Sequence, residues 1–220
     1  FKICKKRKKQ KSGIILNSKK ETISKFGLNK NQIKLIHIFL EELKQKNKSI
    51  NLVGKSTIEN AWDRHVCDSL QIFSYIKNKK LKIIDMGTGA GIPGIFLSIM
   101  GCQNVVMVDS IKKKTNFVRD VIFKLKISAK VSNSRLENLK TSPAKHIVSR
   151  ALAPLEKLIS YSLLFSNKDT SLLFLKGRNV KKEIQQAKKK YTFRYKIFNS
   201  LSSGDGYVLK IKDFKKKWQK

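Results

Sequence analysis

The stretch of sequence that decides the fold is LKIIDMGTGAGIPG, residues 81–94. Its first six residues are mostly apolar and predict a short buried strand. The remaining eight residues include four glycines, which predict a turn where a ligand can approach the backbone closely. Pro93 suits the first turn of a following helix, because its missing N–H would have no partner there. Residues 81–94 therefore predict a strand, a ligand-binding loop and the start of a helix.

Further short apolar runs follow this stretch, and amphipathic helical patterns separate them. The later strands are predicted at 105–108, 129–131, 146–149 and 172–175. Buried strands that alternate with helices are typical of a parallel sheet with both faces covered. Two strand-like segments, 191–198 and 207–211, have little chain between them, which predicts an antiparallel pair. The predicted fold class is therefore α/β, with a mostly parallel central sheet and an antiparallel last strand.

The chain before the first strand has the pattern of helices. Apolar residues at helical spacing mark one face of a long helix at Ile33, Ile36, Leu40 and Leu43. Ser56 and Glu59 have capping-box spacing, which predicts that a second long helix begins there. The apolar face of that second helix would carry Trp62, Val66, Leu70 and Phe73.

Changes in composition divide the chain into four expected parts. These are a basic arm at 1–18, a helical subdomain at 19–78, a cofactor-binding domain at 79–213 and a basic tail at 214–220. The whole chain has 49 lysine and arginine residues against 15 aspartate and glutamate residues, a formal net charge of +34. Such a charge attracts a polyanion, foremost a nucleic acid. Compositional drift in an AT-rich genome explains the charge equally well, so charge alone does not decide the function.

Composition also excludes several classes of protein. No apolar run approaches the roughly 20 residues that span a bilayer, so we expect no membrane contact. The three cysteines form no CxxC pair, which argues against a disulfide framework and against a structural zinc site. We expect a monomer in the reducing cytoplasm, with no bound metal.

Two carboxylates beside the glycine loop indicate its ligand. Asp109 ends the next predicted strand, where an acid can accept hydrogen bonds from both ribose hydroxyls of an adenosine cofactor. The loop satisfies G-x-G-x-x-G, and Asp109 follows Gly89 by 20 residues, which fits a dinucleotide such as NAD. Asp85 would face the cationic amino and sulfonium groups of S-adenosyl-L-methionine, whereas it would repel a pyrophosphate. No substrate domain follows, so S-adenosyl-L-methionine is favoured, with an NAD-dependent oxidoreductase as the alternative.

Several segments in order resemble a known family, the bacterial small-subunit rRNA guanine-N7 methyltransferases called RsmG or GidB. The segments are NLV at 51–53, RHVCDSL at 64–70, DMGTGAGIPG at 85–94, DS at 109–110, SRLE at 134–137, SRA at 149–151 and LKG at 175–177. The resemblance covers roughly residues 20–212. It implies a Rossmann-like class I methyltransferase with an N-terminal helical extension, which uses S-adenosyl-L-methionine to methylate N7 of a guanine in 16S rRNA of the small ribosomal subunit. A non-catalytic RNA-binding or ribosome-assembly factor on the same fold is a further alternative.

The resemblance also implies the site residues. The cofactor would lie against the loop and the strand ends, at Asp85, Gly87, Gly89, Gly91, Ile92, Asp109, Ser110, Leu136, Glu137 and Arg150. Leu136 and Glu137 would flank the adenine, and Arg150 would lie near the methionine end or the incoming base. The residues expected to act on the target are His65, Asp68, Arg150 and Lys176.

Three of these target residues also have a purely structural reading. His65 fits a core histidine, Asp68 an i,i+4 pair with Arg64, and Arg150 a pair with a strand-end acid. The family usually carries a basic residue before its last strand, and this chain lacks it around Gly206-Tyr207. Part of the expected RNA contact is therefore changed.

Overall fold

The computed structural model describes residues 18–202 and 204–217. The basic arm predicted at 1–18 lies outside these residues except for Ser18, and the last three residues of the predicted tail do as well. No helix of the described part is long and apolar enough to cross a membrane. The described part also holds no group of three histidine, cysteine or acidic side chains placed to bind a metal ion.

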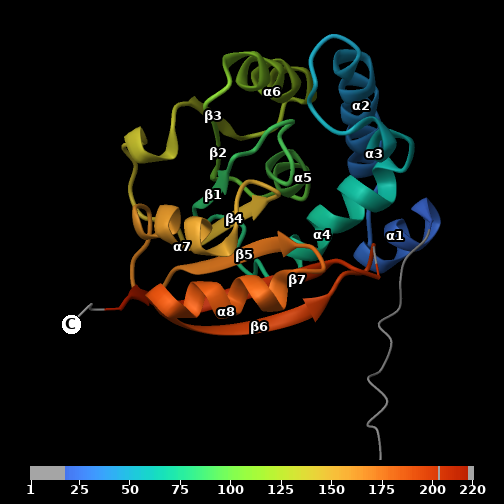
Figure 1. Cartoon of the computed structure of the whole chain (residues 1–220). Coiled ribbons are helices and arrows are strands. Elements are labelled where there is room, and N and C mark those ends of the chain that lie inside the picture. The colour runs from blue at the N-terminus through green and yellow to red at the C-terminus, as the bar shows by residue number, and fades with distance from the viewer. Residues whose placement is uncertain (1–17, 203, 218–220) are drawn as a thin grey trace, which may run out of the picture.

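A seven-stranded sheet forms the centre of the molecule (Figure 1). Its strands are β1 (Ile83–Met86), β2 (Val105–Asp109), β3 (Lys130–Asn133), β4 (His146–Arg150), β5 (Ser171–Lys176), β6 (Tyr191–Asn199) and β7 (Tyr207–Lys216). They lie in the order β3-β2-β1-β4-β5-β7-β6. The strands β1 to β5 are parallel, and β7 is antiparallel to both β5 and β6. The predicted fold class is confirmed, although β7 extends five residues beyond the predicted 211.

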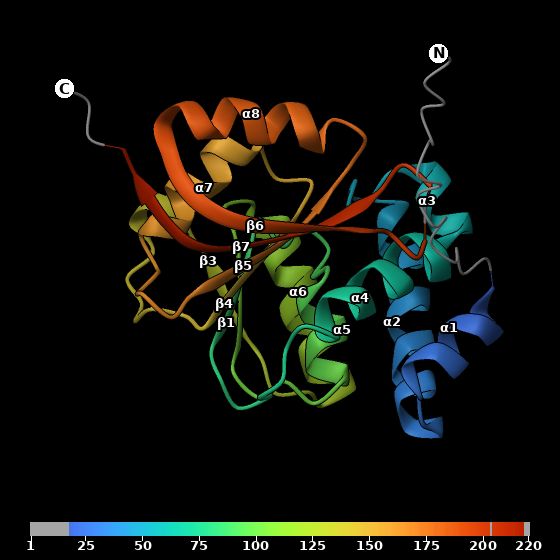
Figure 2. The ribbon, with the colours of Figure 1, turned by 90° about the horizontal axis from the view of Figure 1, so that it is seen from below.

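Helices cover both faces of this sheet. They are α1 (Lys19–Phe26), α2 (Lys30–Asn47), α3 (Lys55–Glu59), a π-helix (Trp62–Cys67), α4 (Asp68–Phe73), α5 (Gly94–Ile99), α6 (Lys112–Leu125), a 3₁₀ turn (Leu136–Asn138), α7 (Leu155–Leu163) and α8 (Val180–Lys190). One buried cluster joins α2, α4, α5 and α6 to the sheet, and a second joins α7 and α8 to the opposite face. Figures 1 and 2 show α7 and α8 together on one side and the earlier helices on the other.

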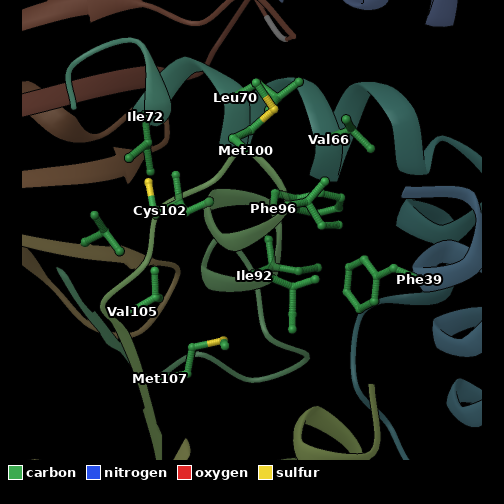
Figure 3. Close-up of a cluster of buried hydrophobic side chains, with 14 of the residues drawn as sticks. Phe39, Val66, Leu70, Ile72, Ile92, Phe96, Met100, Cys102, Val105 and Met107 are labelled. Carbon is green, nitrogen blue, oxygen red and sulfur yellow. The ribbon is translucent and has the colours of Figure 1, made fainter. Parts of the chain in front are cut away.

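The N-terminal helices are fixed to the sheet through α5. Figure 3 shows Phe39 of α2 facing Phe96 of α5, and their ring centroids are 5.1 Å apart in an edge-to-face arrangement. Val66 and Leu70 lie against the same helix, beside Met100. All five side chains are at most 5% exposed. This packing gives the segment before β1 a fixed position beside the carboxyl ends of the strands.

The capping box predicted at Ser56 is wrong. The helix α3 begins at Lys55, with Gly54 as its N-cap, and ends at Glu59, because the C-cap residue Asn60 leaves the helical region with a φ of −107° and a ψ of 37°. The chain continues as the π-helix and then as α4, so the predicted second long helix is divided. Residues 65–72 are buried except for half-buried Asp68, so packing on several sides overrides the local helical pattern here.

Candidate active site

The glycine loop after β1 is held from beneath by Asp85. This side chain is fully buried, and its Oδ2 accepts hydrogen bonds from the Thr88 hydroxyl at 2.5 Å and from the Gly94 N–H at 2.9 Å. Its other oxygen, Oδ1, is buried without a hydrogen-bond partner. A Cβ on Gly94 would lie 2.9 Å from Oδ2 and 2.4 Å from Met107 Cγ, so this contact requires glycine. Asp85 therefore shapes the loop from inside.

Burial raises the pKa of Asp85 to about 7, although the two hydrogen bonds partly oppose this rise. Because the folded chain then binds this proton more tightly than the unfolded chain, the contribution of Asp85 to stability falls as pH rises from about 4 to about 7. We expect Asp85→Asn, which keeps the shape and loses the charge, to remove this fall. Urea unfolding of both proteins at several pH values measures it.

The two buried histidines also make the stability depend on pH in that measurement. Burial lowers the pKa of His65 to about 3 and that of His146 to about 4, so their contributions rise with pH over a similar range. Both proteins share these contributions, and the difference between the two proteins isolates Asp85. A difference that stays constant from pH 4 to pH 7 would contradict the assignment.

A cavity of about 120 Å³ lies above the loop, at the carboxyl ends of β1 and β2; we call it the loop cavity. Five of the predicted cofactor residues line it, namely Gly87, Asp109, Ser110, Leu136 and Glu137. Sequence reasoning did not assign the other lining residues, which are Val108, Ser134, Arg135, Leu152 and Tyr161. Ser134 and Arg135 directly precede Leu136 in the sequence, so their position in the chain could have indicated them. Tyr161 on α7 gave no such signal.

Asp109 connects the loop cavity to the glycine loop. Its Oδ2 accepts a hydrogen bond from the Gly89 N–H at 3.0 Å, and its Oδ1 accepts one from the Ile111 N–H at 2.9 Å. A carboxylate oxygen accepts more than one hydrogen bond, so both oxygens keep capacity for a ligand's hydroxyl groups. Gly89 thus helps to fix the position of Asp109 in the loop cavity through its backbone N–H.

Gly91 and Ile92 point away from the loop cavity. A Cβ on Gly91 would lie 2.6 Å from Ile95 Cγ1, and Ile92 is 5% exposed among the core side chains of Figure 3. Here the chain passes from the loop into α5, and both residues lie on the side of the loop that packs on the core. Neither residue lines the loop cavity, and the contact with the cofactor that the resemblance implies for them stays a prediction.

A second cavity of about 430 Å³ lies beside the first; we call it the Arg150 cavity. Its lining comes from the π-helix and α4, the ends of β4 and β5 with the residues that follow them, α8, and the segment between β6 and β7. The lining residues are Arg64, Asp68, Arg150, Ala151, Leu175, Lys176, Gly177, Arg178, Glu183, Ser200, Asp205, Gly206 and Tyr207. Three of the four predicted target residues line it. The fourth, His65, is 1% exposed and lies behind Arg150.

His65 holds the Arg150 guanidinium in place. The Nδ1 atom of His65 lies 2.6 Å from Nη1 of Arg150. Burial, together with the positive charge of Arg150, lowers the pKa of His65 to about 3, so the ring is neutral and Nδ1 accepts the hydrogen bond. Its Nε2 is buried without a partner. His65 is therefore a positioning residue, and it is neither a lining residue nor an ordinary core histidine.

Asp68 lies on the other side of the Arg150 cavity, at the start of α4. It accepts hydrogen bonds from the hydroxyls of Ser200, at 3.4 Å, and Ser202. Burial raises the pKa of Asp68, and the charge of Arg150 opposes that rise. An acid and a guanidinium therefore face the same cavity, where they can recognise a base edge.

Lys176 is engaged within the protein. Its Nζ lies 2.5 Å from Glu183 Oε2 and donates to the Ala153 carbonyl at 3.1 Å. The same Glu183 oxygen accepts a hydrogen bond from the Leu155 N–H at 2.7 Å. Lys176 thus fastens the loop after β4, which the sequence could not indicate, because Glu183 and Ala153 lie in other elements.

Leu152, in that loop, separates the two cavities. Ala151 lines the Arg150 cavity, while Leu152 lines the loop cavity and is 38% exposed. Gly87 has a φ of +66°, and a Cβ there would lie 2.4 Å from Leu152 Cδ1. The two cavities therefore meet at the Leu152 side chain, with the bare backbone of Gly87 beneath it.

Comparison with known proteins agrees with this geometry. Residues 32–208 match the family model GidB, described as rRNA small subunit methyltransferase G. The chain is 38% identical over 170 residues to ribosomal RNA small subunit methyltransferase G of Orientia tsutsugamushi strain Ikeda, covering 77% of this chain and 85% of the relative. It is 36% identical over 184 residues to that of Rickettsia prowazekii, covering 84% and 95%.

Solved structures support the fold. The ribosomal protein L11 methylase of Lactobacillus delbrueckii subsp. bulgaricus superposes with a TM-score of 0.55 at 20% identity, covering 65% of this chain and 75% of that one. The O-methyltransferase of Bacillus cereus superposes with a TM-score of 0.55 at 15% identity, covering 80% and 90%. With a family model that matches most of its length and relatives above 30% identity, the chain belongs to the rRNA small subunit methyltransferase G (GidB) family.

Proposed function

We propose that this chain transfers a methyl group from S-adenosyl-L-methionine to 16S rRNA of the small ribosomal subunit, at N7 of one guanine. The observation that carries the proposal is the pair of adjoining cavities, one lined by the glycine loop and Asp109 and the other by Asp68 and Arg150. Membership in the GidB family supports the reaction and the ribosomal substrate. We expect the protein to act as a monomer in the cytoplasm, where ribosomes assemble.

The residues of the loop cavity fit the cofactor. Gly87 lines this cavity with bare backbone, and Asp109 retains acceptor capacity for ribose hydroxyls. Leu136 and Glu137, which the resemblance assigns to the adenine, line the same cavity. S-adenosyl-L-methionine, when bound, supplies an electrophilic methyl group on a cationic sulfur. An NAD-dependent oxidoreductase remains the alternative from the loop motif alone, and the family relationship opposes it.

The residues of the Arg150 cavity would hold the target base. The N7 atom of guanine carries a free lone pair, so no residue has to remove a proton before the transfer. Alignment and exclusion of water then account for the rate. Arg150 is placed to donate to guanine O6 or to a phosphate, and its position is fixed by His65. The carboxylate of Asp68 would stabilise the positive charge that develops on the purine.

Methyl transfer from labelled S-adenosyl-L-methionine to small ribosomal subunits tests the proposal. We expect incorporation into 16S rRNA, and mapping of the product should place the methyl group on N7 of one guanine. S-adenosylhomocysteine should raise the melting temperature, and NAD should not. Ligand binding without incorporation would favour the non-catalytic RNA-binding factor, and stabilisation by NAD would favour the oxidoreductase.

A further inference from the structure

One face of the β6–β7 hairpin is open. The helix α8 covers the other face, where Lys188 Nζ lies 4.8 Å from the Tyr195 ring centroid, and Figure 2 shows α8 running along one side of both strands. On the open face, the ring of Tyr75 packs against Phe198 with 4.9 Å between centroids. Among the described helices, only α8 makes extensive contact with β6 or β7. Antiparallel strands commonly leave one face to solvent, so the side chains on this face decide what it can bind.

The open face is cationic and contains pairs of like charges. Arg194 lies directly opposite Lys212 in the strand register, and Lys196 lies opposite Lys210. Like charges directly opposite each other destabilise a sheet. Asp213 pairs with Arg194. No ion pair within residues 18–202 and 204–217 joins Lys196, Lys210 or Lys212 to an acidic side chain. The hairpin therefore concentrates positive charge that the protein does not neutralise.

The neighbours of Lys210 show the same crowding. Burial lowers the pKa of Lys210, and the charges of Lys212, Lys196 and Lys77 lower it further. The Lys210 ammonium also lies 5.4 Å from the centroid of the Tyr75 ring. A bound anion would relieve this repulsion, because it would stabilise every one of these charges at once.

Aromatic rings accompany the charges. A groove of about 660 Å³ is lined by Phe193, Arg194, Tyr195, Lys196, Phe198, Lys210 and Lys212. Of its three rings, Phe198 lies on the open face, against Tyr75, whereas Tyr195 lies on the face that α8 covers. Closely spaced cations of this kind bind a nucleic-acid strand through its phosphates. The ribosomal RNA substrate of the family favours RNA over a lipid surface or an acidic peptide.

Two elements lead from the Arg150 cavity to this face. The strand β7 begins at Tyr207, which lines the cavity, and reaches Lys210 after three residues and Lys212 after five. At about 3.4 Å per residue these lysines lie about 10 and about 17 Å along the strand. The helix α4 likewise begins at Asp68 in the cavity, and Tyr75 follows its end. The open face is thus within a few nucleotides of a base in the cavity.

We propose that the open face of the hairpin, formed by Arg194, Lys196, Lys210 and Lys212, binds the sugar–phosphate backbone of the RNA segment beside the target guanine. This inference rests on the proposed function and gives the RNA a docking site outside the Arg150 cavity. It also implies that the positive charges of the hairpin serve RNA binding while those of α8 do not, since the exposed lysines of α8 do not line this groove.

A charge-matched pair of triple variants tests the docking site. The test variant is Lys196→Glu/Lys210→Glu/Lys212→Glu, and the control is Lys181→Glu/Lys182→Glu/Lys189→Glu on exposed positions of α8. Each replaces three positive charges with three negative ones. We expect the test variant to raise KM for small ribosomal subunits about tenfold or more, and the control to change KM less than about threefold. Affinity for S-adenosylhomocysteine should stay unchanged in both.

Salt dependence gives a second readout. A variant with glutamine at positions 196, 210 and 212 avoids the added negative charge, so it tests the site even if the glutamate variant folds poorly. Its plot of log affinity for 16S rRNA against log salt should have a slope shallower than that of wild type by about 2 to 3, whereas glutamine at 181, 182 and 189 should leave the slope near wild type. Equal KM values and equal slopes for test and control would overturn the docking site. An inactive wild type would instead contradict the proposed function.

Discussion

Replacing Arg150 by lysine is expected to lower kcat for methyl transfer on the order of a hundredfold. In the structure, one guanidinium nitrogen of Arg150 is bonded to His65, so the remaining N–H groups point in fixed directions into the cavity. A lysine keeps the positive charge, yet its single ammonium cannot bind His65 and a base or phosphate in the same planar arrangement. A guanine would therefore be misaligned, which affects the rate more than the binding. Single-turnover methylation of small ribosomal subunits measures this effect.

Two further variants define the role of Arg150. His65→Phe keeps a ring of similar size and removes the acceptor for Arg150, so it should lower kcat in the same direction although His65 touches no substrate. Arg119→Lys, on the exposed side of α6 and distant from both cavities, should leave kcat near wild type. In all three proteins S-adenosylhomocysteine should bind within about threefold of wild type. Full activity of Arg150→Lys would remove Arg150 from the proposed site.

Much of the fold was predictable because it depends on local patterns. The predicted strands 105–108 and 146–149 correspond to β2 and β4 within one residue, since parallel strands buried on both faces are continuous apolar runs. The glycine loop was predictable for a similar reason, because close approach to the backbone requires glycine. The interruption of the second long helix was not predictable, since packing against other elements determines it.

The partners of individual side chains were the least predictable part of the site. Lys176 was expected to be available at the pocket rim, and it is bound to Glu183 and to the Ala153 carbonyl. Asp85 was expected to face the cofactor, and its Oδ2 holds the loop amide and hydroxyl groups. Glu183 lies seven residues from Lys176, and Thr88 lies only three residues from Asp85. The other two partners are a backbone carbonyl, which accepts from Lys176, and the Gly94 N–H, which donates to Asp85, and their positions depend on the folded loops. No spacing in the sequence encodes such contacts.

Gly87→Ala is expected to weaken binding of S-adenosylhomocysteine about tenfold or more, while the free energy of unfolding falls by about 1–3 kcal/mol. An alanine at a φ of +66° is strained, and its methyl group would overlap Leu152 Cδ1, only 2.4 Å away. Leu152 is 38% exposed and has room to rotate, which limits the loss of stability. The new methyl group still occupies the place where a cofactor would contact the backbone. Calorimetric titration and urea unfolding measure the two effects separately.

The double variant Gly87→Ala/Leu152→Ala decides between two reasons for the glycine. If Gly87 serves the cofactor, removing the Leu152 side chain should restore part of the lost stability and none of the lost affinity, because the methyl group at position 87 remains in the loop cavity. Leu152→Ala alone should bind S-adenosylhomocysteine at least as tightly as wild type, since it only enlarges that cavity. If the double variant recovers both stability and affinity, Gly87 is needed only to accommodate Leu152, and the loop cavity would lose its assignment as the cofactor site.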